Sequence, residues 1–201
     1  MVRRMFSEIS GAMKKRMQLL EQMDARDRVD GTDNLKRLKQ IPPETGKFLA
    51  LLAANCPERG EFIEVGTSAG YSTMWISLAL QQRETKLKTF ELLPEKIRLA
   101  NETFRVAGIA DRIVLIEGDF LEMGNSLGEI AFCFLDCEKH LYERCFDMVS
   151  LRLVKGGLLV ADNAIDHADA FKPMIEKAQS DDRFDCLTVP IGKGEFVCRR
   201  K

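Results

Sequence analysis

Short apolar segments alternate with segments of helical periodicity from residue 61 to about residue 180, and few folds accommodate that order. Strands are predicted at residues 61–65, 87–90, 113–116, 130–135 and 157–161. Helices are predicted between and after them, at residues 69–80, 94–106, 141–153 and 167–179. Brief apolar strands joined by helices are typical of a parallel sheet that is covered on both faces. The sequence therefore predicts an α/β fold with a doubly wound sheet.

The end of the sequence departs from this alternation. Two strand-like segments, FDCLTVPI at residues 184–191 and EFVCRR at residues 195–200, are separated only by Gly192, Lys193 and Gly194. Strands joined by so short a glycine-containing loop form a hairpin. One strand of the otherwise parallel sheet is therefore expected to be antiparallel.

The segment FIEVGTSAGYS, residues 62–72, joins the first strand to its helix through a glycine-containing turn. Backbone can approach a ligand closely at Gly66 and Gly70, and the N–H groups of a helix beginning near Ala69 are unpaired. The spacing reads GxSxG instead of GxGxxG, there is no Gly-Lys-Ser/Thr, and the acid Glu64 disfavours a pyrophosphate. This pattern predicts a nucleoside cofactor that is cationic or amphoteric.

Composition excludes several classes of partner. The 201 residues are 45% hydrophobic and 30% charged, which favours one folded domain, and the net charge of -1 gives no electrostatic basis for nucleic-acid binding.

The N-terminal residues contain no signal-peptide apolar region and no membrane span, so a cytoplasmic location is expected. Without a CxxC pair, the cysteines are predicted to be reduced core residues: Cys56, Cys133, Cys137, Cys145, Cys186 and Cys198.

An amphipathic helix is predicted near the N-terminus. Its apolar stripe comprises Phe6, Ile9, Met13, Met17, Leu20 and Met23. Such a face docks on the domain or on a second subunit, with a membrane-surface role as the minor alternative, and a homodimer is expected. We divide the single domain into a helical extension at residues 1–40 and a cofactor-binding core at residues 41–201, whose first helix follows Pro42 and Pro43.

Ligands of open α/β sheets bind beyond the carboxyl ends of the strands. The second strand ends at Glu91, a position suited to a carboxylate that accepts both ribose hydroxyls, although Glu91 could simply cap the helix at Pro94. The third strand is followed by Asp119 and Phe120, which could hold an adenine ring by a hydrogen bond and by stacking.

The next two strands end in oxygen-bearing side chains, Asp136 after one and Asp162 and Asn163 after the other. Two carboxylates and an amide suit a hard cation such as Mg²⁺, while capping of the following helices is the alternative. Lys139 lies close enough to act as a general base, since a nearby dication would help it to lose its proton, or it is an ordinary solvated lysine. His140 receives no role, and His167 is expected at a helix start.

These segments together resemble the class I methyltransferases that use S-adenosylmethionine, and among them the cation-dependent O-methyltransferases that act on catechols and caffeoyl-CoA. The resemblance covers about residues 40–201 and rests on the motifs FIEVGTSAGYS, TFELLPEKIRLA, GDFLE, FLDCEKHLY, LVKGGLLVADN and PIGKGEFVCRR. It implies a Rossmann-like, mostly parallel sheet of seven strands with the last strand antiparallel.

The resemblance also implies roles for individual residues. The metal ligands would be Asp136, Asp162 and Asn163, and the catalytic residues Lys139 and Asp136. The cofactor would contact Ile41, Glu64, Gly66, Thr67, Ser68, Gly70, Tyr71, Ser72, Glu91, Leu92, Asp119, Phe120 and Asp136.

Some positions depart from the family. The segment between Asn163 and Phe184 is shorter than in the plant enzymes, Cys137 and Glu138 replace an aromatic residue, and Lys193 stands where relatives often carry an acid. The leading hypothesis is methyl transfer to a hydroxyl of a small vicinal diol, assisted by a divalent cation. The alternatives are an NAD(P)-binding oxidoreductase and a non-catalytic cofactor-binding interaction module.

Overall fold

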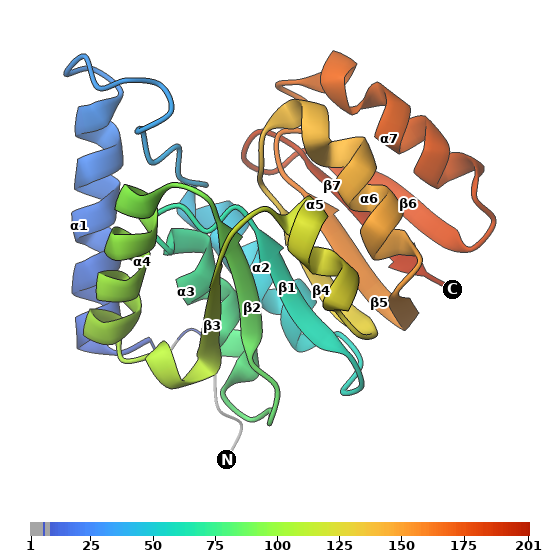
Figure 1. Ribbon diagram of the computed structural model, residues 1–201, viewed down its shortest axis with the longest axis horizontal. Coiled ribbons are helices and arrows are strands. Elements are labelled where there is room, and N and C mark those ends of the chain that lie inside the picture. Colours follow the sequence, from blue (N-terminus) through green and yellow to red (C-terminus); the bar gives the residue numbers. More distant parts are fainter. Residues whose placement is uncertain (1–5, 7–8) are drawn as a thin grey trace.

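The computed structural model describes residues 6 and 9–201, and it places seven strands in one sheet between two layers of helices (Figure 1). The strands are β1 (Glu61–Val65), β2 (Leu87–Glu91), β3 (Ile113–Glu117), β4 (Ile130–Leu135), β5 (Leu153–Ala161), β6 (Phe184–Val189) and β7 (Glu195–Arg200). The α-helices are α1 (Gly11–Asp27), α2 (Pro43–Ala54), α3 (Tyr71–Ser77), α4 (Pro94–Ala107), α5 (Phe120–Met123), α6 (Tyr142–Ser150) and α7 (Ala168–Ser180).

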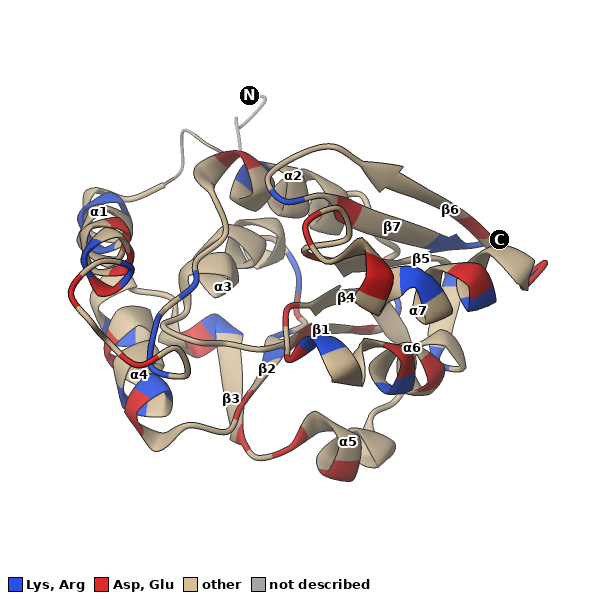
Figure 2. Ribbon diagram, turned by 90° about the horizontal axis from the view of Figure 1, so that it is seen from above, with Lys and Arg blue, Asp and Glu red and all other residues tan. Residues whose placement is uncertain are grey.

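The strand order is β3-β2-β1-β4-β5-β7-β6, which can be followed from above in Figure 2. The strands β1 to β5 pair in parallel, whereas β7 is antiparallel to both of its neighbours, β5 and β6. The predicted fold class and the antiparallel last strand are therefore confirmed. The chain reverses its direction of winding between β1 and β4, which is where open α/β sheets hold their ligands.

Successive side chains of the central strands point to opposite faces of the sheet, and both faces carry apolar side chains. Phe62, Phe132 and Phe134 face the layer formed by α2, α3 and α4. Ile63 and Cys133 point to the opposite face, where α5, α6 and α7 pack. Because successive side chains of a strand point to opposite faces, a strand buried on both sides must be apolar throughout, as β4 is.

The N-terminal helix α1 lies outside α4, at the edge of the molecule (Figure 1). It begins at Gly11, where the side chain of Ser10 accepts a hydrogen bond from the backbone N–H of Met13. The predicted stripe from Phe6 to Met23 implied a helix that starts near Phe6. That start is wrong, because the Ser10 cap begins the helix at Gly11. Residues 1–5, 7 and 8 lie outside the described part of the chain. The buried side chain of Arg16 anchors α1 to α4.

Two further boundaries differ from the prediction. The four-residue helix α5, capped by Asp119, is too short to show helical periodicity in the sequence. The strand β5 begins at Leu153 instead of residue 157, and its first part contains Gly156 with a φ of 82°. A glycine in a strand interior marks an irregularity, and the β4–β5 register indeed shifts between Ile130 and Phe132.

Acidic and basic residues are interspersed along α1 and α4 (Figure 2). Within residues 6 and 9–201, none of the helices combines the length and the apolar character needed to cross a membrane.

Candidate functional site

A cavity of about 600 Å³ opens at the carboxyl ends of the first strands, beside the reversal between β1 and β4. Small-molecule sites usually measure about 300–1,000 Å³. The wall contains residues from the ends of β1, β2, β4 and β5, from the loop after β3, from the segment at residues 34–39 and from the β6–β7 turn. The predicted residues that line it are Gly66, Ser68, Glu91, Leu92, Asp119, Phe120, Asp136, Lys139 and Asn163.

Backbone strain is concentrated in this wall. Among the described residues, the non-glycine residues with positive φ are Lys39, Ser68 and Asn163, at 51°, 47° and 74°. All three line the cavity. A left-handed conformation costs an L-residue about 1–3 kcal/mol and persists where its surroundings enforce it, which is common at ligand sites.

The glycines of the β1–α3 turn serve packing as well as ligand approach. A Cβ at Gly66, where φ is 102°, would collide with the backbone carbonyl of Asp136. A Cβ at Gly70 would collide with the ring of Phe104 on α4, and Gly70 does not line the cavity. The sequence indicated close approach to a ligand at both positions; at Gly70 the close neighbour is instead a helix.

Glu64 lies below the cavity and does not line it. Its side chain is fully buried and accepts hydrogen bonds from the hydroxyls of Ser72 at 2.5 Å, Thr73 at 2.5 Å and Thr89 at 2.6 Å. Burial raises the pKa of Glu64 to about 7, and the hydroxyl donors only partly oppose this effect. The arrangement makes Glu64 a support for the turn above it.

Glu91 joins two loops of the cavity wall. One carboxylate oxygen accepts from the backbone N–H of Ser68 at 2.7 Å, and the other accepts from the N–H groups of Leu92 at 2.9 Å and Leu93 at 3.0 Å. Ser68 is held on its other side by the carbonyl of Leu38. Glu91 thus orders the loop before α4 and lines the cavity, but it bonds no N–H group of α4 itself, so the alternative that it caps this helix is wrong.

The loop after β3 contributes Asp119 and Phe120 to the wall. Asp119 caps α5 by accepting from the N–H of Leu121 at 2.8 Å. Phe120 is buried and contacts Phe90 edge to face, with ring centroids 5.1 Å apart. The aromatic pair forms an apolar side of the cavity.

A recess of about 20 Å³ adjoins the cavity beneath the β1–α3 turn. The predicted residues that line it are Ile41, Gly66, Thr67, Ser68, Tyr71, Ser72 and Asp136. The hydroxyl of Thr67 lies 2.6 Å from that of Thr89, and Tyr71 donates to Glu21 of α1. Most polar groups of the recess thus have partners, but the buried Oε1 of Gln40, which also lines it, has none among the described residues.

Asp136, Asp162 and Asn163 lie together beyond β4 and β5. The Asn163 amide donates to Asp162 Oδ2 at 2.7 Å and to Asp136 Oδ1 at 3.3 Å. Asp162 is buried behind the cavity wall, and its Oδ1 has no hydrogen-bond partner among the described residues. Burial raises the pKa of Asp136, and the charge of Asp162 adds to this effect.

This oxygen set fits a hard cation in its chemistry. Two carboxylates and an amide are ligands that Mg²⁺ accepts, and a buried carboxylate oxygen without a donor gains from a cation. Within the described part of the chain, no group of three or more His, Cys, Asp and Glu side chains is arranged to hold a metal. The expected set relies on the amide of Asn163 in addition to the acids.

Sequence reasoning did not identify Glu195, the first residue of β7. It is fully buried, lies against Asp162 and Thr45, and neither carboxylate oxygen has a hydrogen-bond partner among the described residues. Burial, together with the charge of Asp162, raises the pKa of Glu195 far above that of an ordinary carboxyl. Its place directly before the apolar run Phe196–Cys198 could have indicated a buried acid.

Lys139 begins the turn before α6 and extends along the cavity wall. Its Nζ lies 3.5 Å from Asp136 Oδ1 and 3.4 Å from the hydroxyl of Tyr142. The same nitrogen is 5.2 Å from the centre of the Tyr142 ring. The ammonium group is therefore held beside the carboxylate that the sequence assigned to the metal.

Further cavity residues were not predicted to contribute to the site. They include Asn34, Leu35, Leu38, Lys39, Lys96, His167 and Lys193. Lys96 is partly buried, and burial lowers its pKa. Lys193 reaches the cavity because its carbonyl accepts from the N–H groups of Ile165 and Asp166, which fixes the β6–β7 turn against the loop after β5.

The sequence profile of a family described as O-methyltransferase matches residues 10–201. The match includes α1, which the sequence-based resemblance had left out. A catechol O-methyltransferase of Niastella koreensis is 34% identical over 131 residues, which is 62% of this chain and 58% of that protein. Caffeoyl-CoA O-methyltransferase 1 of Zea mays is 28% identical over 84% of this chain and 78% of its own length.

A methyltransferase of Podospora anserina, solved with S-adenosylhomocysteine bound, is similar in structure with a TM-score of 0.77. It is 20% identical in sequence, and the match covers 96% of this chain and 89% of the other. At that identity the likeness concerns the fold. Since the family profile extends from the start of α1 through β7, the chain belongs to the O-methyltransferase family.

Proposed function

We propose that the protein transfers a methyl group from S-adenosylmethionine to one hydroxyl of a small vicinal diol of the catechol type, with the assistance of a divalent cation. Family membership supports transfer to oxygen. The single observation that carries the proposal is that one cavity is lined both by the residues expected to bind the cofactor and by Asp136, Lys139 and Asn163.

The cofactor side of the cavity lies between the β1–α3 turn and the loops after β2 and β3. Glu91 would accept hydrogen bonds from the ribose hydroxyls, since it lines the cavity while its carboxylate orders Ser68 and Leu92. Phe120 and Asp119 would hold the adenine ring. S-adenosylmethionine carries the methyl group on a positively charged sulfur. The carboxylates that line the cavity, Glu91, Asp119 and Asp136, would favour that positive charge.

The acceptor side lies around Asp136, Lys139 and Asn163. The side-chain oxygens of Asp136 and Asn163, with Asp162 behind them, would hold the cation, whose chemistry is to lower the pKa of a hydroxyl that it binds. A vicinal diol presents two adjacent oxygens and so matches a site with open positions. Lys193 and His167 border the same part of the cavity.

Lys139 would take the proton from the reacting hydroxyl at its Nζ. Asp136, 3.5 Å from that atom, would orient the ammonium group as it forms, and the Tyr142 hydroxyl gives a second fixed contact at 3.4 Å. The remaining work of the chain is to hold the methyl donor and the acceptor oxygen in line, at a separation of about 3 Å.

The test separates binding from chemistry. Calorimetry with S-adenosylhomocysteine and with Mg²⁺ or Mn²⁺ should detect both binding events in the wild-type protein and in Lys139→Ala. Turnover of catechol-type diols should fall by about 10²–10⁴-fold in Lys139→Ala, and Lys139→Arg should not restore it, because arginine keeps the charge but does not act as a base. Undiminished turnover in Lys139→Ala would refute the role of this lysine.

The cation is tested by Asp136→Asn, which keeps the shape of the side chain. Metal affinity should weaken by about tenfold or more with the loss of a ligand charge. Asp119→Asn is the matched control on the cofactor side, and its metal affinity should equal that of the wild type. Full activity after complete chelation would remove the cation from the proposal.

The same measurements decide between the functional alternatives. Binding of NADH in preference to S-adenosylhomocysteine would support an oxidoreductase. Cofactor binding with no turnover of any diol in the presence of each metal would support a non-catalytic module.

A further inference from the structure

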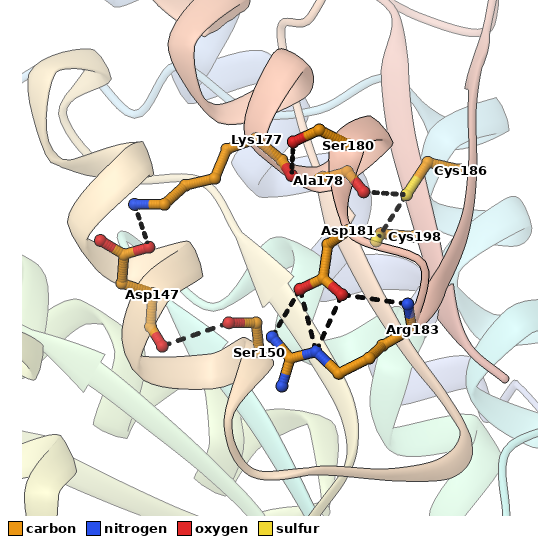
Figure 3. A network of polar contacts seen from close by, with 9 residues as sticks. All are labelled: Asp147, Ser150, Lys177, Ala178, Ser180, Asp181, Arg183, Cys186 and Cys198. Atoms are coloured by element: carbon orange, nitrogen blue, oxygen red, sulfur yellow. Dashed lines mark hydrogen bonds and ion pairs between the residues drawn. The ribbon is translucent and has the colours of Figure 1, made fainter.

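Cys186 and Cys198 face each other across the β6–β7 hairpin. They are directly paired in the register of the two strands, and their Sγ atoms lie 2.7 Å apart (Figure 3). Both thiols are free. Residues that pair directly on antiparallel strands have Cβ atoms roughly 4.5–5.5 Å apart, so a covalent bond of about 2.05 Å between the sulfurs requires little backbone movement.

The two thiols differ in their surroundings. Cys198 is fully buried in the core beneath α7, whereas Cys186 is half-buried on β6, the edge strand of the sheet. Cys186 also contacts the carbonyl oxygen of Ala178 at the end of α7, as Figure 3 shows. A reagent from solvent can therefore approach Cys186 and not Cys198.

The hydrogen bond between the thiols makes this difference chemical. Either sulfur could be the donor in this contact; when Cys198 donates, the contact favours the thiolate of Cys186, which lowers the pKa of Cys186 and raises that of Cys198. Lys201 favours the same thiolate, while Asp181 and Asp185 oppose it. The thiolate is the attacking form in exchange reactions, so the accessible member of the pair is also the more nucleophilic one.

We propose that Cys186 and Cys198 form a thiol–disulfide exchange site for low-molecular-weight disulfides, with Cys186 as the attacking residue and Cys198 as the resolving residue. The Cys186 thiolate attacks one sulfur of the small disulfide, forming a mixed disulfide and releasing one thiolate. Cys198 then loses its proton to water and attacks Cys186 Sγ, releasing the second thiolate. The protein thiols lose two electrons and two protons in total, and the small disulfide is reduced to two thiols.

The product would cross-link the hairpin whose turn carries Lys193 into the cavity. The other cysteines lack this combination of properties. Burial raises the pKa of Cys56 to about 12, and Cys133 is fully buried. Contact with Cys145 and burial raise the pKa of Cys137. These thiols provide internal controls.

The experiment exposes the folded protein to mixtures of reduced and oxidised glutathione at neutral pH. The protein is then unfolded in denaturant, so that buried thiols also react, and free thiols are trapped with N-ethylmaleimide and mapped by mass spectrometry. The wild type should lose about 2 Da as the Cys186–Cys198 disulfide forms. Cys198→Ser should instead accumulate a stable glutathione adduct on Cys186, because the resolving thiol is gone. Cys186→Ser should acquire no adduct, because Cys198 is buried, and Cys56→Ser should behave as the wild type.

The proposal is overturned if Cys186 and Cys198 both remain alkylatable in oxidised glutathione alone, if Cys198→Ser forms no adduct, or if another cysteine is modified first. Circular dichroism checks that each variant is folded, and Cys198→Ala replaces the serine variant if a buried hydroxyl prevents folding. None of these readouts depends on methyl transfer, so failure here leaves the proposed function untouched, and the converse also holds.

Discussion

Glu64 is the residue whose chemistry the sequence described least accurately. Its position after two apolar residues and before Gly66 suggested a carboxylate exposed to a cofactor, yet the side chain is enclosed by the hydroxyls of Ser72, Thr73 and Thr89. A strand tells which face a side chain points to, but the depth at which that face is covered depends on residues far along the chain, Thr89 among them.

The buried carboxyl makes stability depend on pH. The pKa of Glu64 is raised from 4.5 to about 7, so the folded state binds a proton that the unfolded state releases between those values. Stability from this group is therefore present at low pH and is lost as pH rises through about 7. Glu64→Gln has no titrating carboxyl at this position and so does not lose this stability. Between pH 4.5 and about 7, its free energy of unfolding should therefore rise relative to that of the wild type by on the order of 3 kcal/mol.

The measurement is the free energy of unfolding by urea at a series of pH values for both proteins. The exposed substitution Glu84→Gln serves as the control and should show a flat difference from wild type. A flat difference for Glu64→Gln as well would mean that the carboxyl is already ionised at low pH.

At the level of elements, the β1–α3 turn is limited by its neighbours more than by its ligand. Gly66→Ala places a methyl group against the Asp136 carbonyl at a φ of 102°, so we expect a loss of stability above about 3 kcal/mol together with loss of S-adenosylhomocysteine binding. Gly108→Ala is the matched control, because Gly108 also has a positive φ, 72°, but has open space around it.

Urea unfolding and calorimetry on the two variants check this prediction. Gly108→Ala should lose only about 1–2 kcal/mol from the left-handed backbone and should bind the cofactor product normally. Equal losses in both variants would show that backbone conformation, and not the approach of β4, sets the requirement for glycine at Gly66.

An element could be predicted from the sequence when neighbouring residues determine it, and was missed when contacts between distant residues determine it. The strand β4 was placed correctly because burial on both faces requires an uninterrupted apolar run, and the hairpin because Gly192 and Gly194 permit its turn. Helix α5 was missed because a single capped turn has no periodicity. The cavity wall at residues 34–39 was missed because its position is set by long-range contacts such as Ser68 Oγ to the Leu38 carbonyl.

In the candidate site, too, some residues could be predicted from their neighbours in the sequence, whereas others are brought there only by long-range contacts. The residues directly after the strands, such as Asp136 and Glu91, could be predicted because parallel strands bring their carboxyl ends to one edge. Glu195 and Lys193 come from the antiparallel hairpin, and only the packing of its turn against Ile165 and Asp166 brings them near that edge. The roles assigned to these residues remain proposals.

For the whole molecule, the question is whether α1 is an extension or part of the folded unit. Arg16 is only 4% exposed and donates to the Thr103 hydroxyl at 3.0 Å, to Glu102 at 3.2 Å and to the Leu99 carbonyl at 3.4 Å. Arg16→Met keeps the aliphatic stem and removes these donors, so it should destabilise the protein by about 1–3 kcal/mol.

If α1 folds with the core, Arg16→Met lowers one cooperative transition that is seen equally by helical signal and by the fluorescence of Trp75. The exposed substitution Lys15→Met should leave that transition unchanged. Separate transitions, with helix lost before the tryptophan signal changes, would instead support the division into residues 1–40 and 41–201.

The place of β7 has a consequence for synthesis on the ribosome. Because β7 lies between β5 and β6, the edge of β5 stays open and β6 has no partner until the last strand has left the exit tunnel. Five parallel strands can associate during translation, but the sheet closes only when a late, local hairpin docks as a unit. A nascent chain stalled before residue 195 would expose the apolar edge of β5, which makes it a substrate for chaperones and for aggregation.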